Sequence, residues 1–136
     1  IEDIQILNST GHPTTALLRG DRTTVRIRAR FHQPSKNPIA GLLIRNRLGI
    51  DVYGTNTRIE QIALGEYSPG DLLELDFVFD CWLVRHEYTL TVAMQHADGA
   101  SQDWLDDAVS FSVADPKEIA GLVDLKAEIR FRNPAS

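Results

Sequence analysis

The apolar residues of this chain recur at every second position over several stretches. In residues 25–31, the apolar Val25, Ile27, Ala29 and Phe31 are separated by arginines. A period of two places apolar side chains on one face of a β-strand and polar side chains on the other. The alternation is clearest at 25–32, 73–80, 88–95, 109–113 and 123–131, and weaker strands are predicted at 2–7, 39–46, 51–56 and 59–66.

Turn-forming residues separate these stretches. They are Gly-His-Pro at 11–13, Gln-Pro-Ser at 33–35, Ser-Pro-Gly-Asp at 68–71 and Asp98-Gly99. Short strands at this spacing predict an all-β fold, an antiparallel β-sandwich formed as a single domain by residues 1–136. Helix is favoured only over 103–107, as one turn, and over 116–121, as a connector after Pro116.

The last alternating stretch, 122–131, follows a hinge-like segment, Asp115-Pro116-Lys117-Glu118. A terminal strand on such a hinge has two possible positions. It can fold back on to its own sheet as an edge strand, or it can cross to a second copy and form a strand-exchanged dimer.

Composition excludes several classes of protein. The 136 residues carry 14 Lys and Arg against 19 Asp and Glu, a net charge of −5, which argues against a nucleic-acid partner because phosphate binding needs a basic surface. The single cysteine, Cys81, excludes an intramolecular disulfide and fits a reducing compartment. No apolar run approaches the roughly 20 residues of a membrane helix, so we expect no direct membrane insertion.

The sequence contains no recognisable catalytic or cofactor motif. Phosphate-binding loops and the G-x-S-x-G elbow are absent, and the four histidines lie on separate segments without the spacing of metal ligands. The carboxylates of the acidic stretch, Asp98, Asp103, Asp106 and Asp107, do not follow the calcium-loop pattern and are interpreted as a solvated hairpin tip. We therefore expect no cofactor, no metal and no catalytic residue, although spacing alone leaves a glycosidase carboxylate pair open.

Two polar stripes of opposite charge lie on different predicted strands. One contains Arg26, Arg28 and Arg30, and the other contains Glu74, Asp76 and Asp80. If the two strands are neighbours, the stripes pair across the sheet. This is a simpler interpretation than a phosphate-binding face.

A third polar face is almost free of charge. The outward residues of 87–96 and 108–114 are short hydroxyl, amide and alanine side chains, with the neighbouring strand 39–46 adding Arg45 and Asn46, and Trp104 and Tyr53 supplying aromatic rings. Sugars pack their C–H faces on aromatic rings and bond their hydroxyls to amide and guanidinium groups. The predicted ligand-binding residues are Arg45, Thr89, Thr91, Gln95 and Ser110, with Trp104 at the rim. The alternative is an ordinary solvated sheet face, with Thr and Ser present for their β-propensity.

Several segments resemble a known family. Gly49 is followed by Tyr-Gly-Thr-Asn-Thr at 53–57, and the stretches Tyr-Thr-Leu-Thr-Val-Ala at 88–93 and Trp-Leu-Asp-Asp-Ala-Val-Ser-Phe at 104–111 come later in the same order. This set resembles the C-terminal domain of the ATP-binding subunit, of Wzt type, of O-antigen polysaccharide ABC transporters. The resemblance spans most of residues 2–114. We interpret Thr55 and Asn56 as residues that shape a turn.

The resemblance implies an immunoglobulin-like β-sandwich that recognises the end of the lipid-linked O-polysaccharide glycan without catalysis. The ATPase activity would then reside in a separate nucleotide-binding domain. The resemblance also implies a homodimer with exchanged strands at 122–131. It implies a cytoplasmic position at the inner face of the bacterial inner membrane. The partners would be the nucleotide-binding and membrane subunits of the transporter, which serves lipopolysaccharide biosynthesis.

Two other functions remain open at this stage. One is an immunoglobulin-like protein–protein interaction module without a glycan ligand, and the other is a glycosidase. For the glycan-binding hypothesis, a bulky residue at Thr91 or Ser110 is expected to abolish binding and leave the thermal midpoint nearly unchanged.

Overall fold

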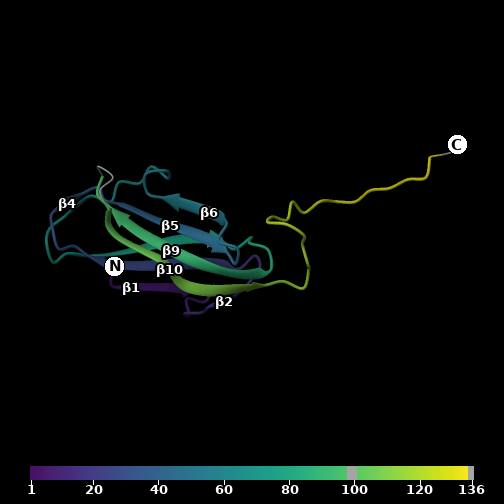
Figure 1. Ribbon diagram of the computed structural model, residues 1–136, viewed down its shortest axis with the longest axis horizontal. Helices are drawn as coiled ribbons and strands as arrows, with labels where there is room; N and C mark the ends of the chain where they lie inside the picture. Colours follow the sequence, from purple (N-terminus) through teal and green to yellow (C-terminus); the bar gives the residue numbers. More distant parts are fainter. Residues whose placement is uncertain (98–100, 135–136) are drawn as a thin grey trace.

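The computed structural model describes residues 1–97 and 101–134, so the expected turn at Asp98-Gly99 lies outside the described residues. The described strands form two facing sheets and a short ribbon (Figure 1). One sheet has the order β1 (Asp3–Leu7), β3 (Arg22–Arg30), β8 (Leu72–Asp80). The other has the order β2 (Ala16–Leu18), β10 (Ser101–Ala114), β9 (His86–Gln95), β5 (Ile39–Asn46), β6 (Asp51–Asn56), and β4 (Ser35–Lys36) pairs with β7 (Glu66–Tyr67). The predicted all-β sandwich is confirmed.

The core lies between the two sheets and is built from the apolar half of each alternating strand. Val25 and Ile27 of β3 pack in one cluster with Ile44 of β5 and Leu90 of β9. Each of these side chains is at most 2% exposed. Full burial of such a side chain contributes about 1.5–3 kcal/mol, which is why the period-two pattern determines which face of each strand turns inward.

The two charged stripes pair as expected. β3 and β8 are antiparallel neighbours, with Arg26 opposite Asp76 and Arg28 opposite Glu74. The Arg26 guanidinium donates to both carboxylate oxygens of Asp76, at 2.9 and 3.0 Å. Exposed pairs of this kind contribute only about 0.2–1 kcal/mol each, so their main effect is on strand register.

The structure corrects three predicted elements. The strand predicted over 59–66 is wrong for residues 59–65, and only Glu66 lies in a strand, β7. A turn forms instead, because the Asn56 side chain accepts the backbone N–H of Ile59 and the Thr57 carbonyl oxygen accepts the backbone N–H of Ile62. Residues 103–107 belong to β10, where pairing with β9 overrides any local helical preference. Residues 116–121 contain no helix.

The C-terminal segment has two parts with different surroundings. Asp124 is held against the sandwich by Arg19 (3.2 Å) and Lys117 (3.2 Å), and the Lys126 ammonium lies 3.5 Å from the centre of the Trp82 ring. Beyond this anchor the chain runs away from the sandwich (Figure 1), and Leu125, Ile129 and Phe131 are 85–89% exposed. Within this single copy, residues 122–131 form no strand, because none of the described strands lies beside them to pair with. Exchange with a second copy stays a prediction.

Candidate functional site

The outer face of the five-stranded sheet brings most of the predicted ligand-binding residues together. β5 pairs with β9 and β9 with β10, as the sequence analysis expected. The register places Arg45 beside Thr89, Thr89 beside Ser110, and Ala93 beside Trp104. Residues directly opposite across a sheet share a face, so these side chains point outward together.

A shallow hollow of about 280 Å³ lies over β5, β6, β9 and the start of β10. We call it the glycine-floored hollow because Gly41, Gly54 and Ala93 form its base. A Cβ atom at Gly54 would lie 2.9 Å from Leu43 Cδ1, and one at Gly41 would lie 3.1 Å from Asn56 Cβ. A side chain at Gly54 would displace the end of the Leu43 side chain, and one at Gly41 would require Asn56 to shift by a few tenths of an ångström, so glycine keeps the base of the hollow open at both positions. The lining residues are Ile39, Gly41, Leu42, Leu43, Gly54, Thr55, Asn56, Ile59, Thr91, Ala93, Gln95 and Trp104.

One end of this hollow is bordered by a bulge in β10. Leu105 pairs with Val92 and Val109 with Leu90, so residues 106–108 lie opposite Thr91 alone. The extra length lifts this part of β10 over the sheet, with Asp107 in a left-handed conformation (φ 47°).

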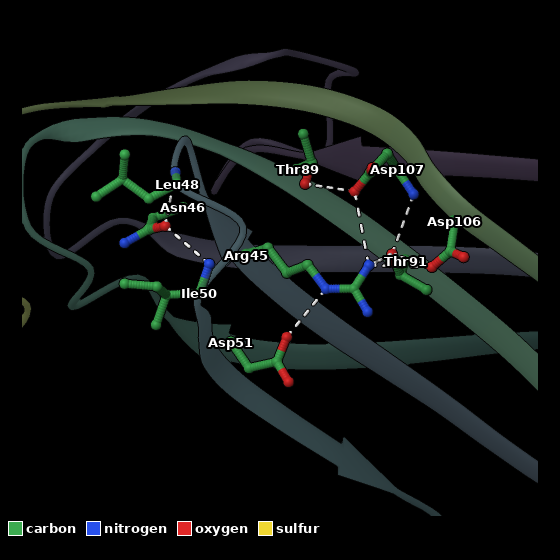
Figure 2. A network of polar contacts seen from close by, with 9 residues as sticks. All are labelled: Arg45, Asn46, Leu48, Ile50, Asp51, Thr89, Thr91, Asp106 and Asp107. Atoms are coloured by element: carbon green, nitrogen blue, oxygen red, sulfur yellow. Dashed lines mark hydrogen bonds and ion pairs between the residues drawn. The ribbon is translucent and has the colours of Figure 1, made fainter.

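The bulge is held by a compact polar network, shown in Figure 2. The Thr91 hydroxyl oxygen accepts the backbone N–H of Asp107 at 3.0 Å, and the Thr89 hydroxyl donates to the Asp107 carboxylate at 2.8 Å. The Arg45 guanidinium donates to Asp51 at 2.9 Å and to Asp106 at 3.0 Å. Arg45 thus joins the β5–β6 hairpin to the bulge of β10.

The electrostatics of the network oppose proton transfer near neutral pH. Hydrogen bonding to Asp51 and then to Asp106 raises the pKa of Arg45. A hydrogen bond from the Trp104 indole, followed by one from Arg45, lowers the pKa of Asp106 below its usual 3.8. A general acid or base works best with a pKa close to the operating pH, and both shifts move away from it.

A second hollow, of about 340 Å³, lies beyond the bulge on the same face. We call it the Ser110 hollow. It is lined by Thr15, Asn46, Arg47, Glu87, Tyr88, Thr89, Ser110, Phe111 and Ser112. The predicted site is therefore divided: Thr91, Gln95 and Trp104 line the first hollow, Thr89 and Ser110 line the second, and Arg45 lies between the two groups.

Three residues have different positions from those the sequence suggested. Thr91 is 1% exposed and its hydroxyl is used inside the network, so it supports the bulge. Tyr53 lies opposite the buried Ile44 and faces the gap between the sheets, away from the hollow. The Asn46 side chain accepts the backbone N–H groups of Leu48 and Ile50 and so closes the hairpin tip (Figure 2).

Sequence reasoning missed the β5–β6 side of the glycine-floored hollow. Gly41, Leu43, Gly54 and Ile59 were not among the predicted residues. The available signal was the Gly-Thr-Asn-Thr run, interpreted as a turn. Asn56 does form the turn that follows β6, but it also lines the hollow. The two roles are compatible because its side-chain oxygen bonds the turn while its Cβ lies beside Gly41.

Two further observations concern the described part of the chain. Within it, no group of three histidine, cysteine, aspartate or glutamate side chains is placed to hold a metal ion. It also contains no helix with the length and apolar character needed to cross a bilayer.

Comparison with known proteins identifies the family. The family model described as the Wzt C-terminal domain matches residues 1–125. The chain belongs to the Wzt C-terminal domain family. A crystal structure of the C-terminal domain of Wzt superposes with a TM-score of 0.87 at 21% identity, covering 97% of this chain and 83% of the other. Among curated proteins, no sequence matches the chain significantly.

Membership of the Wzt C-terminal domain family confirms the resemblance seen in the sequence. It makes this chain a C-terminal domain of an ABC-transporter subunit, separate from the ATPase domain. At 21% identity the structural likeness establishes the fold, and the site must be judged from the side chains of this chain.

Proposed function

We propose that this Wzt C-terminal domain binds the terminal part of a lipid-linked O-antigen polysaccharide without altering it, and so gives an ABC exporter its substrate recognition. The observation that carries the proposal is the glycine-floored hollow, which combines a half-exposed aromatic wall at Trp104 with amide side chains at Gln95 and Asn56. A pyranose stacks one C–H face on such a ring and bonds its hydroxyls to such amides.

The glycine-floored hollow suits this role better than the Ser110 hollow. Trp104 is 48% exposed, so its indole ring is accessible to a sugar, and the neighbouring Asp106 is held by Arg45 at 3.0 Å. The Ser110 hollow contains the charged Arg47 and Glu87 and no half-exposed aromatic ring among its described lining residues. We place it outside the primary site.

A binding role also agrees with the chemistry of the bordering carboxylates. Hydrolysis of a glycosidic bond needs one carboxylic acid and one carboxylate close to the sugar. Asp51 and Asp106 are both ion-paired with Arg45, and the pKa of Asp106 is lowered, which leaves it unsuited to donate a proton near neutral pH. The domain would therefore pass the glycan on unchanged.

We further propose that the domain acts as a homodimer that exchanges its C-terminal segments. The inner face of β8 is incompletely covered: Phe77 and Phe79 are half-buried and border a hollow of about 530 Å³ between β8 and β6. In the described part of the chain, β8 pairs on one side only, with β3. An unpaired edge beside an apolar surface is a site for strand addition.

The exposed C-terminal segment, residues 123–131, has the alternation of apolar and charged residues that a strand added to the edge of β8 requires. Val123, Leu125, Ala127, Ile129 and Phe131 alternate with charged residues. Added to β8 of a second copy, such a strand would turn its apolar residues toward Phe77 and Phe79. Two linked domains would present two glycan sites, which raises the effective affinity of a shallow site. The complex would work at the cytoplasmic face of the inner membrane, beside the transporter's nucleotide-binding and membrane subunits.

An NMR titration with terminal fragments of the O-polysaccharide from the same bacterium tests the glycan proposal. Amide shifts concentrated at Gly41, Ala93 and Gln95 are expected. Ala93→Leu fills the hollow and should remove the shifts, whereas Thr24→Leu, on the outer face of the other sheet, should leave them. Absence of shifts at millimolar ligand would favour a protein-interaction module, and cleavage of the fragment would reveal an enzyme.

A further inference from the structure

The glycine-floored hollow has a chemical character that narrows its ligand. None of its described lining residues carries an ionisable side chain. A sulfate, phosphate or carboxylate group entering it would lose hydration without gaining a cationic partner, and such a transfer is costly. The lining residues therefore do not compensate a charged sugar for the hydration that it loses.

The surroundings of the hollow also disfavour an anion. Arg45 approaches it through Thr91, at 3.5 Å, but is already paired with Asp51 and Asp106 and lies 3.9 Å from Asp107. On the β6 side, Glu60 accepts a hydrogen bond from Thr55 at 2.7 Å.

Arg58 directly precedes the lining residue Ile59 in the chain. Its guanidinium donates to the backbone oxygen of Ala97 at 2.7 Å. Arg45 is already paired with carboxylates, and Glu60 adds a negative charge next to the lining residue Thr55, so the described surroundings favour neutral ligands over anions.

The walls of the hollow add an apolar requirement. Leu43 and Ile59 stand on the β5–β6 side and Trp104 on the β10 side, above a base whose largest side chain is the methyl of Ala93. If a sugar turns only hydroxyl groups toward these apolar walls, those hydroxyls lose their hydrogen bonds to water and find no polar partner in the walls. A sugar carrying a methyl group can bury it there and still direct hydroxyls to Gln95 and Asn56.

We propose that the hollow receives an uncharged pyranose with a methyl-bearing substituent, a 6-deoxy or an N-acetyl group, and discriminates against phosphorylated and uronic-acid sugars. This inference rests on the proposed glycan-binding function and specifies the ligand class of the same site. The neutral lining excludes charge, and the small base with its three apolar walls selects the methyl group.

Matched monosaccharides test this specificity on the intact chain. L-fucose with L-galactose is the matched pair for the 6-deoxy group. N-acetylglucosamine with N-formylglucosamine is the matched pair for the methyl of the N-acetyl group. We expect the methyl-bearing member of each pair to bind about fourfold more tightly, the factor for burying one methyl group. Mannose 6-phosphate and glucuronate should cause no shifts at Gly41, Ala93 or Gln95.

A charge variant provides the complementary measurement. Asp51→Asn removes one partner of Arg45 and should allow mannose 6-phosphate to produce shifts near Thr91 at low salt, whereas Asp21→Asn, which lies away from the hollow, should not. Equal binding within each matched pair, or anionic sugars that bind the unaltered protein as well as neutral ones, would overturn the inference.

Titrations with polysaccharide fragments and with monosaccharides together distinguish a failure of the proposed sugar specificity from a failure of the proposed glycan binding. If polysaccharide fragments shift the hollow but none of the monosaccharides does, the hollow is not a subsite for a single methyl-bearing sugar and the inference fails alone. If neither fragments nor monosaccharides shift it, the proposed function fails as well.

Discussion

Thr91 lies directly beneath Asp107, and its hydroxyl oxygen accepts the Asp107 backbone N–H at 3.0 Å. This contact joins the centre of β9 to the bulge of β10 that borders the glycine-floored hollow. It shows why a residue on the predicted binding face is only 1% exposed. The threonine supports the bulge from below, and its hydroxyl is used within the protein.

Thr91→Val keeps the side-chain volume and removes the acceptor. The Asp107 N–H then loses its partner, and we expect the free energy of unfolding to fall by about 1–3 kcal/mol. Urea unfolding measures this loss. The sequence had suggested an unchanged thermal midpoint for a bulky residue here; the buried position of Thr91 instead predicts destabilisation. Thr89→Val, whose hydroxyl only donates to the exposed Asp107 carboxylate, should cost less. An equal loss in both variants would contradict this role.

Arg45→Met retains most of the aliphatic stem and removes the charge that joins Asp51 to Asp106. We expect a stability change below about 1 kcal/mol, since these pairs are solvent-exposed. Glycan affinity should nevertheless fall, because the bulge beside the hollow loses the contact that joins it to the β5–β6 hairpin. Hydrogen exchange at Asp107 and Ala108 should accelerate. Arg28→Met, on the other sheet, is the matched control and should leave both exchange and binding unchanged.

Trp104→Ala should abolish glycan binding while retaining the fold, since the ring is 48% exposed and lies at the rim. Tryptophan fluorescence gives a direct measurement, because the chain has two tryptophans. In Trp82→Phe, Trp104 is the sole reporter, and its emission should change as polysaccharide fragments are added. An unchanged emission at saturating ligand would place the sugar elsewhere.

Acidification should loosen the bulge through Asp106. Its pKa is lowered in the folded state by the Trp104 indole and then by Arg45. The lowered pKa stabilises the folded state, and this contribution is fully present above the pKa of Asp106 in the unfolded chain, near 3.8. The contribution is lost as the pH falls through the lower pKa of Asp106 in the folded protein. Carboxyl-carbon NMR of Asp106 should therefore titrate below pH 3.8. Arg45→Met should move the midpoint upward, and a midpoint that stays in place would exclude Arg45 as a cause.

Oligomeric state should depend on the exposed C-terminal segment. Ile129→Asp with Phe131→Asp places two charges where exchange requires apolar contact with β8. Light scattering after gel filtration should show a dimer for the unaltered chain and a monomer for this double variant. Glu128→Gln with Arg130→Gln, which changes the polar positions, should remain dimeric. A dimer in both variants would show that the segment is not the link.

Parts of the site were predictable because they depend on strand parity. The alternation in 88–95 required Thr89, Thr91 and Gln95 to share a face, and the register confirms it. The helical turn predicted at 103–107 is wrong. Backbone hydrogen bonds to the long neighbouring strand β9 hold this short segment in an extended conformation, and they outweigh its weak helical preference. Tyr53 was assigned to the wrong face because β6 pairs with β5 through an irregular register after Ile44.

The amino-acid sequence by itself determined the all-β architecture, the inward face of each main strand and the pairing of the Arg26 and Asp76 stripes, because all three follow from a period of two and from charge. Tertiary structure alone decided how the outward residues are arranged around the two hollows. The bulge at residues 106–108 buries Thr91, divides the face into two hollows and pairs Arg45 with carboxylates from β6 and β10. Such contacts join residues far apart in the chain, and a local sequence pattern does not predict which distant residues come together.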